Sequence, residues 1–283
     1  MPARVYASSR MNIGHLVVSP VFDGTMKAPA TAFKGTTDEM WAPHRRFLDA
    51  DGMLEFALGG FLVRAPGERL VLIDAGIGAR TGAIMNGTGQ FSGGELLNSL
   101  AAQGVRTDDI TDVVFTHLHF DHVGWASHEG AIVFPNATYR CDTRDWQHFR
   151  DNERVQPILQ PIADRLVTWD GSGPLCPGID TMSAPGHTPG STILVLSSGT
   201  ARGLLLGDVV HCPVELLDDE WTGLGDVDPE LAKRTRNALA REIEGTDTPV
   251  AAAHFPGMVF GRLLKANGRR QWMVSAAEQA QAG

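Results

Sequence analysis

A dense group of candidate metal ligands follows the strand-like run that ends at Thr116. Three imidazoles and one carboxylate stand close together: His117, His119, Asp121 and His122. Neutral imidazole and ionised carboxylate are natural ligands of zinc and similar divalent ions, and a turn leaving a strand can aim alternate side chains at two neighbouring points. A solvated histidine-rich loop is the alternative, but the block follows a buried run and ends in Gly124. The block therefore predicts a metal site.

Three further candidates lie later in the chain, each after an apolar run and flanked by glycine or proline. They are His187, Asp208 and His254. Taken singly, either histidine is equally typical of a hydrogen-bonded turn, and the aspartate of a helix or turn cap. Together with the first block, they predict a larger metal centre that uses five of the ten histidines.

The elements that must position these residues follow a mixed pattern of strands and helices. Short apolar runs rich in branched residues predict strands over 13–22, 54–63, 69–74, 112–116, 131–134, 138–141, 179–183, 192–196 and 203–206. Helical spacing predicts helices over 95–103 and 229–244. The second has Asp228 at its N-cap, Pro229 at its first position and Gly245 after its end. This pattern favours a layered α/β architecture.

No repeat, low-complexity tract or linker marks a domain boundary, so we expect residues 1–283 to form a single domain. The polar segment from about 24 to 52 is predicted to be a long surface loop that caps the substrate. It carries several large apolar groups, namely Met26, Phe33, Trp41, Phe47 and Leu48. We single out Trp41 and Phe47, together with Phe120 and Trp125, as candidate pocket walls. Anchoring of the loop, or an oligomer interface, is the alternative.

The composition argues against a nucleic-acid or membrane partner. Lys and Arg number 24 against 33 Asp and Glu, the formal net charge is −9, and no basic run appears. No stretch approaches the ~18 apolar residues that span a bilayer, and the first residues form no apolar signal. Three cysteines at no metal-binding or redox spacing fit a reducing compartment, so we expect a cytoplasmic protein.

The order of these motifs resembles the metallo-β-lactamase superfamily. The resemblance rests on His-x-His-x-Asp-His, a histidine in Gly-His-Thr-Pro-Gly, a Gly-Asp pair and a late histidine, over roughly 60–257. It implies an αββα sandwich with two divalent ions, expected to be zinc, at one edge of the two sheets. One ion would be held by His117, His119 and His187, the other by Asp121, His122 and His254, with Asp208 bridging them. Asp74 resembles the family's strand-end aspartate that supports the ligand loop.

The resemblance also implies a reaction. Two ions can share a hydroxide at neutral pH, so no serine or cysteine nucleophile is needed, and Asp121 is a candidate to orient it or to pass a proton. A bridging Asp208 points away from antibiotic hydrolysis and toward dinuclear lactonases, such as acyl-homoserine lactonases. Phosphotriester hydrolysis of the methyl parathion hydrolase type is the alternative. We therefore expect a small-molecule lactone or ester as substrate.

One position departs from the lactonase pattern. Acyl-homoserine lactonases commonly place a tyrosine three residues after the bridging aspartate, where this chain has His211. A neutral imidazole offers one N–H, so His211 is a candidate hydrogen-bond donor to the substrate. A structural histidine bonded to a backbone carbonyl is an equal alternative.

Two other classes of function stay open. One is an oxidoreductase like the persulfide dioxygenases, which use a single iron, and the other is a non-catalytic metal-binding module. The second is disfavoured because a binding module gains little from keeping all seven ligand positions. Relatives of this type often dimerise through loops near the cavity entrance, so a homodimer is also expected.

Overall fold

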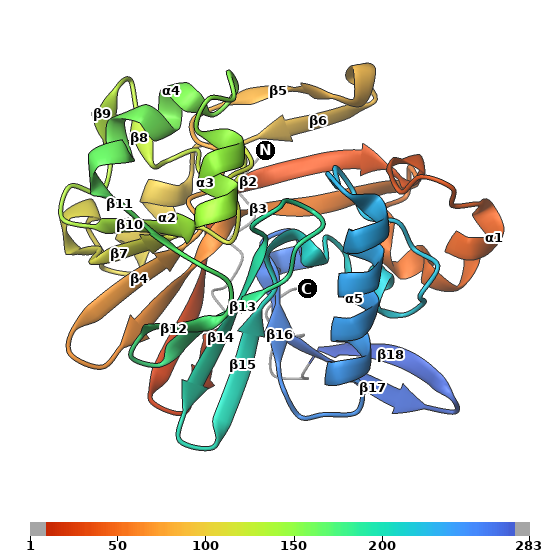
Figure 1. Ribbon diagram of the computed structural model, residues 1–283. Coiled ribbons are helices and arrows are strands. Elements are labelled where there is room, and N and C mark those ends of the chain that lie inside the picture. Colours follow the sequence, from red (N-terminus) through yellow and green to blue (C-terminus); the bar gives the residue numbers. More distant parts are fainter. Residues whose placement is uncertain (1–9, 275–283) are drawn as a thin grey trace.

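The computed structural model describes residues 10–274, which form two β-sheets with helices on their outer faces (Figure 1). The first sheet has the strand order β11-β10-β7-β4-β3-β2-β6-β5, and β1 pairs with β2. Its strands are β1 Met11–Ile13, β2 Leu16–Pro29, β3 Met53–Ala65, β4 Arg69–Ile73, β5 Thr81–Ile84, β6 Gly89–Ser92, β7 Asp112–Val114, β10 Thr138–Asp142 and β11 Leu166–Trp169.

The second sheet runs in the order of the chain, from β12 to β18. Its strands are β12 Gly173–Cys176, β13 Ile179–Ser183, β14 Thr192–Ser198, β15 Ala201–Leu205, β16 Val250–Ala251, β17 Gly261–Ala266 and β18 Arg269–Val274. A separate pair joins β8 Ser127–His128 to β9 Ala131–Ile132. Within this second sheet β15 and β16 are parallel, whereas the other neighbours are antiparallel.

The α-helices are α1 Asp38–Trp41, α2 Leu96–Ala102, α3 Thr143–Phe149, α4 Gln156–Leu159 and α5 Pro229–Ile243. Short 3-10 turns cover Ala30–Ala32, Ala42–Phe47, Met85–Gly87, Thr107–Asp109, Gln160–Arg165, Gly207–Val209, Pro213–Leu216 and Pro256–Met258. Helices α2, α3 and α4 cover the outer face of the first sheet, and α5 covers the second (Figure 1). The predicted αββα arrangement is therefore confirmed. No helix in residues 10–274 is both long enough and apolar enough to cross a membrane.

The core lies in three layers because the central strands are buried on both faces. In β4, Val71 and Ile73 face the second sheet, whereas Leu72 faces the helices of the first. This explains the uninterrupted apolar run of β4, since strands covered on both sides lose the alternation of polar and apolar residues. Each such side chain contributes roughly 1.5–3 kcal/mol of transfer free energy.

The segment from 24 to 52 differs from the predicted surface loop. Strand β2 continues to Pro29 and pairs with β3 along its whole second half, with a register shift between Phe22 and Gly24. A side chain at position 24 would place its Cβ 1.8 Å from the carbonyl oxygen of Ser92, so this glycine permits a close strand contact. Only residues 30–52 leave the sheet, and they include α1. The β5–β6 hairpin was also not predicted.

Candidate metal centre and cavity

The candidate ligands gather where strands of both sheets end. Strands β4 and β7 are parallel, so their carboxyl ends meet, and the block 117–122 follows β7. Asp208 and His254 similarly follow the parallel strands β15 and β16. His187 follows β13, and its neighbour Gly186 lies against the backbone of α5, where a Cβ would be 2.3 Å from the Ala232 nitrogen. The topology thus brings residues from distant parts of the chain to one edge.

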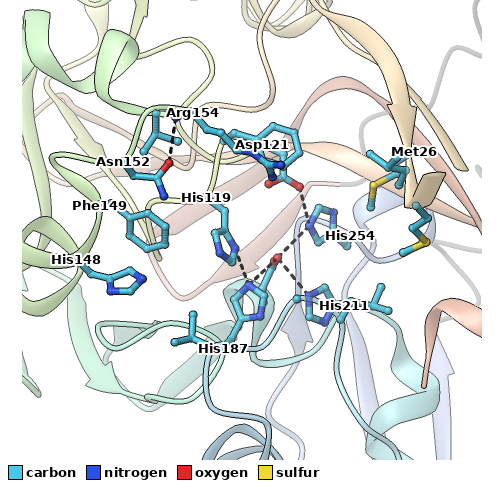
Figure 2. A pocket seen from close by; sticks show the side chains of 18 residues that line it. Met26, His119, Asp121, His148, Phe149, Asn152, Arg154, His187, His211 and His254 are labelled. Atoms are coloured by element: carbon cyan, nitrogen blue, oxygen red, sulfur yellow. Dashed lines mark hydrogen bonds and ion pairs between the residues drawn. The ribbon is translucent and has the colours of Figure 1, made fainter. Parts of the chain in front are cut away.

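Four of the candidates form a first group of converging donor atoms: His117, His119, His187 and Asp208. Their ligand atoms all lie within 4.8 Å of one another. The Nδ1 atom of His119 lies 3.1 Å from His117 Nε2 and 2.9 Å from His187 Nε2. The Oδ2 atom of Asp208 lies 3.5 Å from His187 Nε2. Figure 2 shows the rings of His119 and His187 turned toward each other.

The second group consists of Asp121, His122 and His254. The Nε2 atom of His254 lies 3.4 Å from both His122 Nε2 and Asp121 Oδ2. Asp208 also faces this group, with Oδ1 3.2 Å from His122 Nε2 and Oδ2 3.1 Å from His254 Nε2. Its carboxylate is therefore placed between the two groups.

The donor set fits divalent metal ions better than it fits a self-contained network. The Oδ1 atom of Asp208 is buried, and its contact with His122 Nε2 lacks hydrogen-bond geometry, although buried polar atoms usually have a hydrogen-bond partner. Burial lowers the pKa of His117 and His187, and lowers that of His119 to about 3. These imidazoles are thus held neutral, which is the form that binds a metal.

His122 differs from its neighbours. Burial lowers its pKa, but the carboxylates of Asp208 and Asp74 outweigh burial and raise the pKa well above the usual value. The same proximity to His122 and His254 lowers the pKa of Asp208, although burial alone would raise it. A cation in place of the proton would satisfy these carboxylates in the same way.

Residues that are not themselves candidate ligands make hydrogen bonds to the Nδ1 atoms of the ligand histidines. Asp74 Oδ2 lies 2.9 Å from His122 Nδ1, and the same carboxylate accepts hydrogen bonds from the backbone N–H and the hydroxyl of Thr116. His254 Nδ1 lies 2.9 Å from the Ala57 carbonyl oxygen. Hydrogen bonds at Nδ1 fix each ring so that Nε2 points to the centre. Asp74 lies where the strand-end aspartate was expected.

His187 has an equivalent support that the sequence analysis did not assign. Its Nδ1 atom lies 3.0 Å from Asp226 Oδ1. Asp226 lies two residues before Asp228, the N-cap of α5. The two residues are 39 positions apart in the chain, so no local sequence pattern indicates that they interact.

Asp145 is a second support that was missed. It lies in α3, is fully buried, and accepts hydrogen bonds from the backbone N–H groups of Leu118 at 2.9 Å and Gly190 at 2.6 Å. Leu118 stands between two candidate ligands, and Gly190 follows His187. Asp145 therefore ties together two ligand-bearing loops. Burial raises the pKa of its carboxyl to about 6.

A cavity of about 470 Å³ opens over both groups. His119, Asp121, His187, Asp208 and His254 line it. Apolar side chains form much of the remaining wall, namely Met26, Ile84, Met85, Phe120, Phe149, Val155, Leu224 and Val227. Such a cavity can hold a small molecule with an apolar part beside the ligand atoms.

The predicted pocket residues divide into two sets. Phe120 lines the cavity, whereas Trp41, Phe47 and Trp125 do not. Trp41 packs against Phe33 and Trp221 with ring centroids 5.8 and 4.8 Å away, so it anchors the segment from 30 to 52. Phe47 belongs to the same cluster. The alternative interpretation of these two residues, as anchors, fits the structure.

Trp125 requires a different correction. It is 6% exposed, and its indole N–H donates a hydrogen bond to Asp23 Oδ1 at 2.9 Å. Asp23 is fully buried and also accepts from the backbone N–H groups of Ile77 and Gly78. Trp125 is therefore part of a buried hydrogen-bond network rather than a wall of the cavity. Asp23 was not anticipated because a lone aspartate beside a glycine is typical of a turn.

His211 lines the cavity beside the candidate ligands. Its Nε2 atom lies 3.4 Å from Asp208 Oδ2, and its backbone N–H donates to Glu215 Oε2 at 2.6 Å. Glu215 is fully buried and lies 3.4 Å from the buried Arg236 guanidinium. Burial lowers the pKa of His211, but Asp208 and Glu215 outweigh burial and raise it to about 10. The sequence did not indicate the buried Glu215–Arg236 pair.

A family model agrees with this geometry. The model of the Metallo-beta-lactamase superfamily matches residues 60–254. Among curated proteins, the N-acyl homoserine lactonase AiiA of Bacillus thuringiensis subsp. kurstaki is 26% identical over 194 residues. That alignment covers 62% of this chain and 74% of the lactonase.

Two solved structures are similar over nearly the whole length. The first is AidC, a dizinc quorum-quenching lactonase in complex with the product N-hexnoyl-L-homoserine, with 24% identity and a TM-score of 0.82. The second is the hydrolase AbOPH in the beta lactamase superfamily, with 25% identity and a TM-score of 0.82. Each alignment covers 95% of this chain and 97% of the other. The likeness to AidC shows a shared fold.

Proposed function

The chain belongs to the metallo-beta-lactamase superfamily and is a metal-dependent hydrolase, and we propose that it opens lactones or small esters. The observation that carries the proposal is the placement of Asp208 between two groups of converging donors, beside a cavity with apolar walls. The lactonases among the similar proteins support the substrate class.

We propose that the two donor groups hold two divalent ions, with zinc as the expected metal. One ion would take His117, His119 and His187, the other Asp121, His122 and His254, and Asp208 would contact both. Such ions, when bound, lower the pKa of water and polarise a carbonyl oxygen. Because outer hydrogen bonds orient the imidazoles, little reorganisation is needed when the ions bind.

Asp121 is the proposed proton carrier. It lines the cavity, and its Oδ2 atom lies 3.4 Å from His254 Nε2. An aspartate at this place can accept a proton at a free carboxylate oxygen and pass it to the departing alkoxide of an opened lactone. Its role is then distinct from that of Asp208, whose carboxylate faces both donor groups.

His211 is proposed to donate a hydrogen bond to the substrate. It reaches the cavity next to Asp208, where a lactonase-like tyrosine would stand. In the described part of the chain the one tyrosine, Tyr139, is fully buried, and its hydroxyl donates to the Ala126 carbonyl. We therefore propose that His211 takes the place of this phenol as a hydrogen-bond donor to the substrate.

Phosphotriester hydrolysis is a second candidate, favoured by the lack of a cavity-lining tyrosine in residues 10–274. A single-iron oxidoreductase is a third, because histidine and carboxylate ligands also suit iron.

The deciding experiment compares initial rates of the zinc-loaded protein on aliphatic and acyl-homoserine lactones with rates on a methyl phosphotriester. We expect higher kcat/KM on lactones and loss of activity in Asp208→Ala.

A higher kcat/KM on the phosphotriester than on the lactones would identify the protein as a phosphotriester hydrolase. Inactivity on both, together with iron content and oxygen uptake, would overturn the hydrolase assignment. A homodimer remains a prediction from the resemblance, and light scattering on the purified protein tests it.

A further inference from the structure

One wall of the cavity presents hydrogen-bond donors at some distance from the candidate metal ligands. His148, Asn152 and Arg154 line it, and they belong to the end of α3 and the connection that leads to α4. All three are exposed, so a ligand in the cavity can reach them. None of the three has a role in the mechanism proposed above.

The orientation of Asn152 is set by the chain itself. The backbone N–H of Arg154 donates a hydrogen bond to Asn152 Oδ1 at 3.0 Å, as Figure 2 shows. This bond occupies the acceptor end of the amide, which leaves the two N–H donors of Nδ2 for a ligand. Asn152 therefore offers the cavity donors rather than an acceptor.

Arg154 adds an unpaired positive charge. Within residues 10–274 it has no carboxylate at ion-pair distance, whereas the nearby Arg150 and Arg144 pair with Asp151 and Asp142 at 3.3 and 2.8 Å. Acidic residues outnumber basic ones in this chain by 33 to 24, so the positive charge of Arg154 at the cavity is opposite in sign to the net charge of the chain. A guanidinium binds a carboxylate through two parallel hydrogen bonds.

An apolar stretch separates this wall from the ligand atoms. The ring of Phe149 lies between His148 and His119, with centroids 4.7 and 5.3 Å away (Figure 2). Val155 lines the same side of the cavity. A ligand that reaches both the metal centre and the donors must therefore carry an apolar segment between two polar ends.

From this arrangement we infer that Arg154, Asn152 and His148 form a subsite for a carboxylate at the far end of the substrate. The inference rests on the proposed function and narrows its substrate class to lactones or esters with an acidic group beyond an alkyl segment. Arg154 supplies the charge, and Asn152 and His148 supply further donors.

The first test compares two lactones of equal length, one with a plain alkyl chain and one whose chain ends in a carboxylate. We expect the wild type to prefer the carboxylated lactone in kcat/KM, and Arg154→Gln to lose this preference by about tenfold or more. Arg150→Gln removes a neighbouring arginine that already has a partner, so it should keep the preference. Equal preference in wild type and Arg154→Gln would contradict the subsite.

A binding test keeps the inference independent of turnover. The zinc-loaded protein is titrated with dicarboxylates of increasing length and with monocarboxylates of matched length. At one length the second carboxylate should tighten Kd by about tenfold, and Arg154→Gln but not Arg150→Gln should abolish the gain. No gain at any length would overturn the subsite. A gain without lactone hydrolysis would keep the subsite and reject the proposed function.

Discussion

The metal-ligand edge of the cavity and its outer wall are built from different kinds of structure. The ligands follow the ends of buried strands. Neighbouring residues orient them through hydrogen bonds at Nδ1, as Asp74 does for His122. The outer wall comes from the β5–β6 hairpin and connecting segments, where Met85 and Val227 are 40% and 49% exposed. Reactive groups thus have rigid support, and the wall that meets the substrate can vary without disturbing them.

The largest expected effect comes from Asp145, which ties two ligand loops together. Asp145→Ala leaves the buried N–H groups of Leu118 and Gly190 without an acceptor, so we expect a loss of about 2–4 kcal/mol in the free energy of unfolding. Denaturant unfolding of the metal-free and zinc-loaded forms measures it. Asp145→Asn keeps one acceptor oxygen and should fall between the wild type and alanine. An unchanged midpoint in Asp145→Ala would show that the two loops hold their places without it.

A somewhat smaller effect is expected at Asp74. Asp74→Ala removes the acceptor that orients His122, and such changes typically cost about 10–100-fold in metal affinity or activity. Competition with a chromophoric chelator measures the affinity. Asp151→Ala, which removes an exposed carboxylate paired with Arg150, is the control and should match the wild type. Equal zinc affinity in the two variants would show that Asp74 does not contribute to metal binding through His122.

His211→Ala tests a residue that lines the cavity beside the metal ligands and that we propose contacts the substrate. We expect a roughly tenfold or greater fall in kcat on a lactone, because one hydrogen-bond donor to the substrate is lost. Metal content should stay at the wild-type level in His211→Ala, whereas Asp74→Ala should lose metal. Unchanged kinetics would return His211 to a structural role.

The smallest effect is expected at the outer wall. Met85 stands at the tip of the β5–β6 hairpin with a φ of 51°, and its side chain lines the cavity. Met85→Asn should change the free energy of unfolding by less than about 0.5 kcal/mol, since asparagine tolerates this backbone conformation. KM for long-chain lactones should rise while kcat stays the same. A large loss of stability would contradict the division between a rigid centre and a variable wall.

The same division separates what the sequence predicted from what it did not. The ligand block could be recognised because its imidazoles are neighbours in the chain and follow an apolar strand. Asp145 and Glu215 could not, because each is a single acidic residue whose partners are brought close only by folding. Their burial depends on contacts with distant loops, which no local pattern records.

The wall residues were harder to predict for a related reason. Large aromatic residues in a polar segment indicate burial, but not whether they face a cavity or a core. Trp125 faces the core because Asp23, 102 positions earlier, accepts its N–H. The second half of β2 was missed because Gly24 and Pro29 suggested a loop, whereas pairing with β3 keeps that half extended.

The most direct test of the account is the metal content of the purified protein and of Asp208→Ala, measured together with lactone hydrolysis. If Asp208 lies between two ions, the wild type should hold two divalent ions per chain, and the variant should lose at least one of them along with its activity. Two ions and undiminished hydrolysis in Asp208→Ala would contradict the central place given to this carboxylate.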